Sequence, residues 1–174
     1  MRYNKLQLAG ELLVAAAEDC RNAACDQDYA KSILVAGAVT GIVEPLLKEL
    51  GIVPHHIGLA RGAVEFKELD GPLFSPEERA QLIRQGRTYY QLAYSALKHA
   101  GFPGKNIKAS ENLEFETNLK EEAYYLVDSA INDYIKIPAQ YLPSAPSEAL
   151  QILLAKPWEL PFCEDDALHR EQKA

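Results

Sequence analysis

Residues 28–50 read DYAKSILVAGAVTGIVEPLLKEL, and their pattern indicates the architecture of the chain. Its apolar residues recur at helical spacing along one face and also cover much of the opposite face. A helix that is apolar nearly all round is buried on several sides. The stretch therefore predicts a central helix that begins with Asp28 as N-cap, ends before Gly51 and is kinked at Pro45.

Three further long helices are predicted over residues 4–24, 76–100 and 118–137, with a short fifth helix over 147–155. All three long segments have apolar residues three or four apart, and two of them follow a capping residue, Ser75 or Asn118. Residues 55–74 are expected to be a long connection. The predicted fold class is all-α, an up-and-down bundle of four main helices plus a short C-terminal helix.

The composition of the chain restricts its organisation and partners. The 174 residues predict one helical-bundle domain over residues 1–156, followed by a tail over residues 157–174. A net charge of −7 gives no general attraction for nucleic acid. Three cysteines without a metal-ligand spacing favour reduced thiols in a cytoplasmic protein. We expect no membrane association, no cofactor and no bound metal.

Each of two short motifs outside the predicted helices can be interpreted either as a ligand-binding site or as an ordinary loop or turn. His55-His56 has the residue type of a metal site, but no ligand partner at a metal-binding spacing lies nearby in the sequence, which favours solvated loop residues. Residues 101–106 resemble a phosphate-binding loop faintly, but the full pattern and a preceding strand are absent, which favours a simple turn.

His99 is the strongest candidate for a functional side chain. It follows Lys98 at the end of the segment Tyr94-Ser95-Ala96-Leu97-Lys98-His99, in the last turn of the predicted helix. The carbonyl end of a helix favours a protonated imidazole. The histidine therefore has a structural interpretation, as a helix-end residue that satisfies free carbonyls, beside a binding or catalytic one.

Three sequence segments in order resemble the HEPN superfamily, the higher eukaryotes and prokaryotes nucleotide-binding domain. The second helix of its small bacterial members reads roughly L-A-G-A-A-E-E-I-L-G, and residues 35–44 here read VAGAVTGIVE. The third helix there ends R-N-A-L-K-H, where this chain has YSALKH at residues 94–99. The fourth carries an acidic start and then alanine, asparagine and tyrosine, as in EEAY at 121–124 and AINDY at 130–134. The resemblance spans about residues 5–137.

In active members of that superfamily, the arginine and histidine of an R-x(4–6)-H motif act with a polar residue of the second helix. Two protomers together form a metal-independent ribonuclease site. Here Tyr94 stands at the arginine position, and Thr40 and Gly41 stand at the two glutamate positions. A tyrosine supplies neither a permanent positive charge nor a bidentate fork. The resemblance thus implies a degenerate site with catalytic positions Tyr94, Lys98 and His99 and binding positions Thr40, Ser95 and Arg87.

These observations favour a non-catalytic HEPN-like dimerising or binding protein, with a stress or defence module as the setting that the resemblance suggests. One alternative is a metal-independent ribonuclease that uses His99, with Lys98, Arg87 or a residue of a second chain as the cation. Another is a bundle that binds a nucleotide or a small ligand. We expect a homodimer with His99 at or near its interface, whereas nucleotide or RNA as a partner has weaker support.

Overall fold

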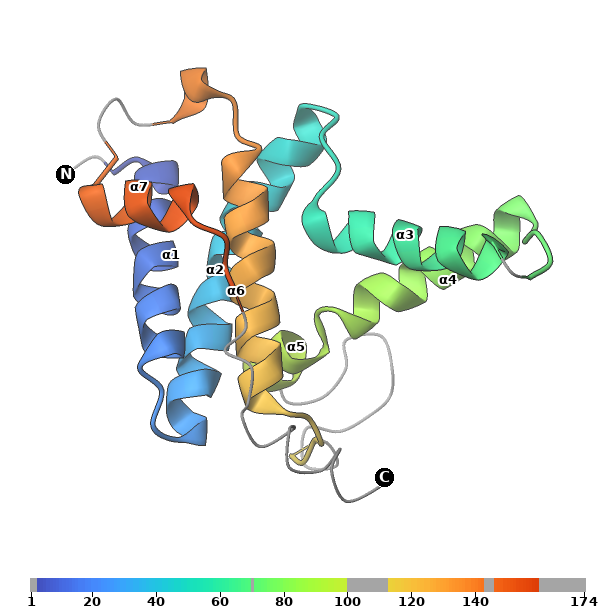
Figure 1. The fold of residues 1–174 in the computed structure, drawn as a ribbon, viewed down its shortest axis with the longest axis horizontal. Coiled ribbons are helices and arrows are strands. Elements are labelled where there is room, and N and C mark those ends of the chain that lie inside the picture. Colours follow the sequence, from blue (N-terminus) through green and yellow to red (C-terminus); the bar gives the residue numbers. More distant parts are fainter. Residues whose placement is uncertain (1–2, 70, 100–112, 143–145, 160–174) are drawn as a thin grey trace, which may run out of the picture.

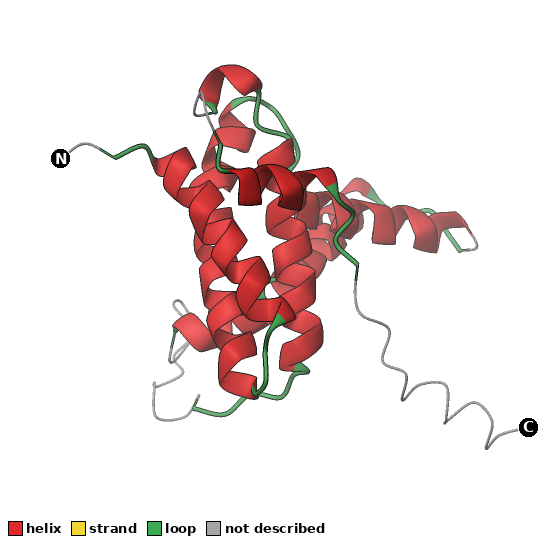
Figure 2. Cartoon of the chain, turned by 60° about the vertical axis from the view of Figure 1, so that its left-hand side comes forward, coloured by secondary structure: helices red, strands yellow, loops and turns green. Residues whose placement is uncertain are grey.

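The computed structural model describes residues 3–69, 71–99, 113–142 and 146–159, and the described residues are helical or irregular, without a strand. The all-α prediction is therefore confirmed. The body of the molecule consists of α1 (Lys5–Arg21), α2 (Asp26–Glu49) and α6 (Leu119–Ile135), which lie side by side in both views (Figures 1 and 2). The short helix α5 (Leu92–Lys98) packs on α2, and α7 (Glu148–Ala155) packs across α1.

The central position predicted for α2 is confirmed. It packs against α1, α5 and α6, and its side chains Ile33, Val39 and Leu47 are fully buried. By length and composition alone, α2 is also apolar enough to cross a membrane, but half of that stretch is buried inside the chain, as in the core helix of a bundle. Pro45 lies inside α2, on its exposed side.

A helical hairpin, which we call the α3–α4 arm, projects from the body (Figure 1). It consists of α3 (His55–Leu69) and α4 (Pro76–Tyr89), packed against each other. The prediction that residues 55–74 form a connection was wrong. Gly58, Gly62 and several charges obscure the helical pattern of α3, whose buried side is only the narrow stripe of His56, Ala60 and Val64.

The helix predicted over residues 76–100 is divided in the structure. It is interrupted at Tyr90 and Gln91, so that α4 belongs to the arm and only α5 continues on the body. Tyr90 stacks on Tyr125 of α6, with ring centroids 5.1 Å apart and an interplanar angle of 22°. This stacking anchors the chain where it leaves the arm and returns to the body.

Local capping explains most helix ends. As predicted, the side chains of Asn118 and Ser75 accept hydrogen bonds from backbone N–H groups in the first turns of α6 and α4. Gly51 has φ of 70°, and Ile52 N–H donates to the Leu47 carbonyl at 2.8 Å, a Schellman end to α2.

The start of α2 differs from the prediction, because its N-cap is Cys25. Asp28 is the third residue of the helix, and its side chain accepts a hydrogen bond from the Cys25 backbone N–H. Hydrogen bonds from the Ala24 N–H and from Cys25 lower the pKa of Asp28.

Trp158 fastens the described end of the chain to the body. Its indole N–H donates to the carbonyl of Tyr124 at 3.0 Å, and its ring packs beside that of Tyr124. The guanidinium of Arg21, the last residue of α1, lies 4.6 Å from the centroid of the Trp158 ring, a cation–π contact. The third cysteine, Cys163, and the turn predicted at residues 101–106 lie outside the described residues.

Candidate functional site

Tyr94, which the resemblance aligns with an arginine, has a packing role. Its half-buried ring lies directly against α2 at Gly37, where a Cβ atom would overlap the ring carbons. Gly37 therefore forms a notch for the aromatic ring. The notch explains why a small residue in α2 faces a bulky one in α5.

The remaining motif residues of α5 lie at its exposed end. The Lys98 ammonium lies 5.2 Å from the centroid of the Tyr94 ring, a cation–π contact. His99 is an exposed C-cap residue whose backbone N–H donates to the Ser95 carbonyl. Its imidazole makes no hydrogen bond or ion pair with any residue that the structure describes.

The two predicted binding residues outside α5, Thr40 and Arg87, bond to groups other than His99. The Thr40 hydroxyl donates to the Ala36 carbonyl of its own helix at 3.2 Å. Arg87 lies at the foot of the arm, where its guanidinium pairs with Glu44 at 3.3 Å. Among the described residues, no hydrogen bond or ion pair joins Thr40 or Arg87 to His99. The structure thus brings Tyr94 and Lys98 together but does not gather the six positions around one point.

A second set of polar groups, which sequence reasoning missed, lies where the arm meets the body. We call Glu44, His55, His56 and Asp133 the base cluster. The largely buried Glu44 carboxylate forms ion pairs with the Lys48 ammonium at 2.5 Å and the Arg87 guanidinium at 3.3 Å. Because Arg87 belongs to α4, Glu44 links α2 to α4. One carboxylate on the central helix therefore holds one helix of the arm.

Asp133 of α6 holds the other helix of the arm. It is fully buried, and its Oδ1 accepts the His55 backbone N–H at 2.6 Å and the Lys136 ammonium at 3.3 Å. The Lys136 ammonium also donates to the Val53 carbonyl. Because an N-terminal N–H of a helix lacks an intrahelical partner, Asp133 serves as a remote N-cap for α3.

His56 lies between these carboxylates, and the prediction that it is a solvated loop residue was wrong. It is 2% exposed, its Nε2 lies 3.8 Å from Glu44 Oε1, and neither ring nitrogen has a hydrogen-bond partner. Burial lowers the pKa of His56 from its ordinary value, although Glu44 and Asp133 act in the opposite direction. The i, i+4, i+8 stripe of His56, Ala60 and Val64 is the sequence signal that could have revealed it.

One more atom of the base cluster and one hydroxyl beside it also lack hydrogen-bond partners. The Tyr125 hydroxyl and Asp133 Oδ2 are buried without a hydrogen bond, and desolvation raises the pKa of Tyr125 well above its ordinary value. The described residues contain no group of three or more His, Cys, Asp or Glu side chains placed to hold a metal ion. The structural role of the base cluster is to attach the arm to the body.

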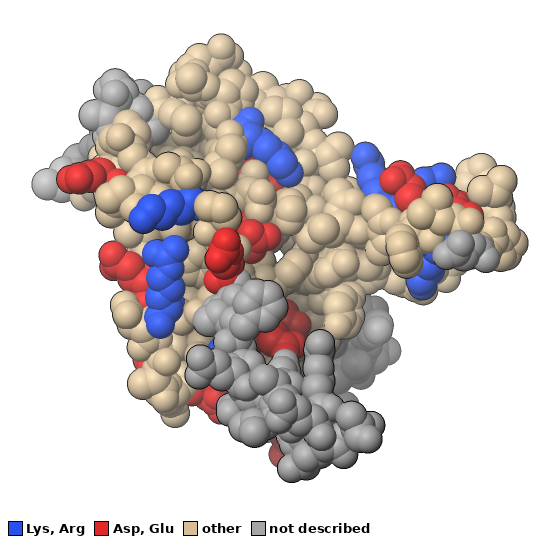
Figure 3. All heavy atoms as spheres, viewed as in Figure 1, with Lys and Arg blue, Asp and Glu red and all other residues tan. Residues whose placement is uncertain are grey.

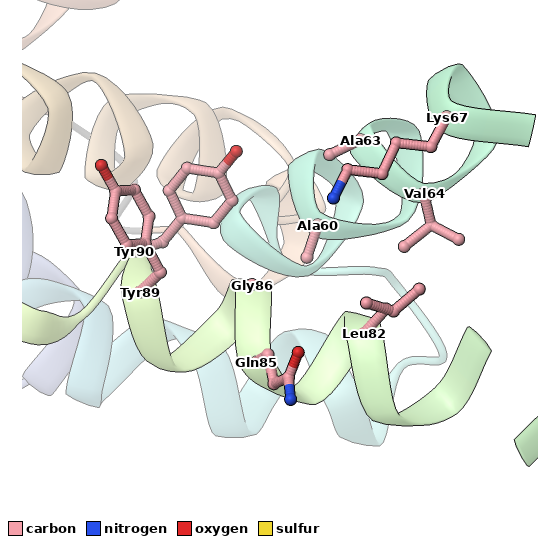
Figure 4. A pocket seen from close by; sticks show the side chains of 9 residues that line it. All are labelled: Ala60, Ala63, Val64, Lys67, Leu82, Gln85, Gly86, Tyr89 and Tyr90. Carbon is pink, nitrogen blue, oxygen red and sulfur yellow. The ribbon is translucent and has the colours of Figure 1, made fainter. Parts of the chain in front are cut away.

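An open groove of about 370 Å³ runs between the two helices of the arm (Figure 4). We call it the α3–α4 groove. Its apolar lining comes from both helices: Ala60, Ala63, Val64, Leu82, Gly86 and Tyr89. Lys67 is its one charged lining residue. On the face shown in Figure 3, acidic and basic side chains are mixed along the arm.

Comparisons of this chain with family models, with curated proteins and with solved structures gave no match.

Proposed function

We propose that this chain is a non-catalytic HEPN-like binding protein that acts as a cytoplasmic homodimer. In this proposal α1, α2, α5 and α6 form the up-and-down four-helix bundle of the superfamily, with α5 as a shortened fourth helix. The matching segments at residues 35–44, 94–99 and 121–134 fall on α2, α5 and α6. A role in a stress or defence module belongs to the same proposal and rests on the resemblance alone.

The environment of Tyr94 is the observation that carries the non-catalytic part. Phosphodiester cleavage builds negative charge on the phosphoryl oxygens, and loss of one preorganised donor costs about 10²–10³ in rate. At this position the chain has an aromatic ring that fills the notch at Gly37. The nearest cation of the motif, Lys98, lies over that ring, and Arg87 is paired with Glu44. None of these groups forms a preorganised phosphate clamp beside His99.

Exposed apolar side chains support the binding part. The arm keeps Phe66, Leu69, Leu73 and Tyr89 between 66% and 84% exposed. Phe66, Leu69 and Leu73 come from the part of the hairpin away from the body and Tyr89 from the end near it, so apolar surface is exposed at both ends of the arm. Exposed apolar surface of this kind marks an interaction site when it is contiguous.

Two measurements test the proposal. Purified protein and its His99→Ala variant are incubated with structured and single-stranded RNA without added metal, and neither is expected to cleave. Cleavage by the wild type that the variant lacks would instead support the ribonuclease alternative, with a second chain supplying the cation. Sedimentation equilibrium should show dimers at micromolar concentration, and a species that stays monomeric would contradict the homodimer.

A further inference from the structure

The α3–α4 arm buries very little apolar surface within one chain. No residue of α4 is buried, and α3 buries only His56, Ala60 and Val64. Helices of 14 and 15 residues are marginal in water, and most helical stability in proteins comes from the packing of an apolar face. The base cluster secures only the end of the arm that adjoins the body. The rest of the hairpin therefore has an apolar face with too little to pack against.

The two edges of the arm differ in charge. Along one edge Arg79 of α4 pairs with Glu65 at 3.1 Å and with Glu68 at 3.2 Å, so ionic contacts already close this edge. The α3–α4 groove lies away from these pairs and has Lys67 as its one charged lining residue. The core of a protein interface is depleted of charge and enriched in aromatic residues. The groove edge has this composition and the opposite edge does not.

We propose that the α3–α4 groove binds the same groove of a second copy of this chain, with the two arms antiparallel, so that the homodimer contains an intermolecular four-helix bundle. This inference rests on the homodimer of the proposed function and places its interface on the arm, in place of the interface around His99 that the resemblance suggests. Two antiparallel hairpins packed face to face can complete the short core that each hairpin lacks alone.

Self-complementarity argues for a second copy as the occupant. A two-fold interface uses the same patch twice, so the patch must contain both a projection and a recess. Tyr89, 66% exposed, is the projection at the end of the groove near the body. Ala60, Ala63 and Gly86 form a shallow floor without large side chains, and the groove is open beside them. In a parallel arrangement the two Tyr89 side chains would meet each other. In the antiparallel arrangement each Tyr89 faces the other end of the partner groove, at Val64 and Leu82, and the two small-residue floors face each other between them.

The exposed aromatic surface of the arm is large enough to matter in such an interface. Phe66, 70% exposed, follows Ala63 by three residues and so adjoins the groove. Since an aromatic side chain buries about 150–250 Å², covering the exposed parts of Phe66 and Tyr89 removes roughly 200–350 Å² from water. Each partner of a stable interface contributes about 800 Å². These two side chains would supply a substantial share of that area.

A matched pair of substitutions tests the interface. Ala63→Arg places a long cation on the floor of the groove, next to Lys67. Ala80→Arg makes the same change on α4 outside the groove lining. Both alanines are exposed in the monomer, and arginine is a good helix former, so both variants should keep the helical content of the wild type. We expect Ala63→Arg to weaken dimerisation at least tenfold in sedimentation equilibrium and Ala80→Arg to leave it unchanged.

The other outcomes separate the two proposals. A wild-type protein that remains monomeric would remove both the homodimer and this interface. A wild-type dimer that Ala63→Arg leaves intact would overturn the arm interface alone and place the contact elsewhere, for example around His99. Equal loss of dimers in both variants would also overturn it, because the effect would not depend on the groove.

Discussion

The ring of Tyr94 on α5 lies against the backbone of α2 at Gly37, at a point where any side chain would overlap it. One turn along α2, Gly41 is exposed, and a Cβ atom there would meet no other atom within 4 Å. The two glycines therefore share a helix and differ only in what faces them.

Alanine substitution should have opposite effects at these two positions. Gly37→Ala forces the Tyr94 ring out of its notch and should lower the free energy of unfolding by about 1–3 kcal/mol. Gly41→Ala should raise it by about 0.5–1 kcal/mol, because alanine is the better helix former. Urea unfolding of both variants measures the difference. Equal shifts in the same direction would show that the Tyr94 contact does not determine the packing of α5.

Removal of the remote cap should loosen the arm selectively. Asp133→Ala deprives the His55 N–H of its buried acceptor, at a cost of about 1–3 kcal/mol. We expect faster hydrogen exchange over the first two turns of α3 and little change in α1. Asp128→Ala is the matched control on the same helix, because the Asp128 side chain is 35% exposed and contacts His55 only at 3.5 Å. Uniform acceleration throughout α3 and α1 would point to global destabilisation instead.

His56 should make the stability of the fold sensitive to mild acid. Because burial lowers its pKa in the folded state, the unfolded chain binds more protons near pH 6, and stability is lost as the pH falls below about 6.5. The loss attributable to one such group is at most about 1.4 kcal/mol per pH unit. The charged groups that act on the imidazole are Glu44, Asp133, Arg87 and Lys48.

Urea unfolding between pH 5 and pH 8 measures this dependence. His56→Gln keeps a polar side chain but cannot titrate, so its stability should fall less steeply with acid than that of the wild type. Identical slopes for the two proteins would exclude His56 as the source.

The two described cysteines should differ in reactivity. Burial raises the pKa of Cys20 to about 11, whereas Cys25 is exposed at the start of α2. Since the thiolate is the nucleophile, iodoacetamide at pH 8 should modify Cys25 roughly tenfold faster or more. Trypsin cleaves after Arg21 and places the two cysteines on separate peptides for mass spectrometry. The difference should vanish in urea, and its persistence there would assign it to something other than the fold.

Sequence patterns reveal the elements whose signals are local. The apolar stripe of residues 28–50 and the caps at Ser75, Asn118 and Gly51 involve residues within one or two turns. They indicate α2, the start of α4 in the arm and the start of α6. For α3 the pattern fails because a helix of a projecting hairpin has only a narrow buried stripe. The apolar spacing that continues from Ile83 to Leu97 also conceals the interruption at residues 90–91.

The base cluster could not be predicted for a different reason. His55 and Asp133 are 78 residues apart, and neither the His55-His56 pair nor the segment AINDY at residues 130–134 indicates that they meet. Their contact depends on the angle between α3 and α6, which no local pattern encodes. For the six motif positions the sequence gives residue types, and these already show that Tyr94 lacks the charge of an arginine. That Tyr94 fills a notch at Gly37 and that Arg87 binds Glu44 are results of tertiary packing.

Trp158 is the sole tryptophan of the chain, and it occupies one defined site between α1 and α6. The tryptophan fluorescence of this protein therefore comes from a single indole whose surroundings are a guanidinium, a tyrosine ring and a backbone carbonyl. Selective excitation of the indole reports whether this last described segment is docked. A spectrum that shifts before the circular dichroism of the helices changes would mark release of that segment as a separate step, so the chain carries its own optical probe.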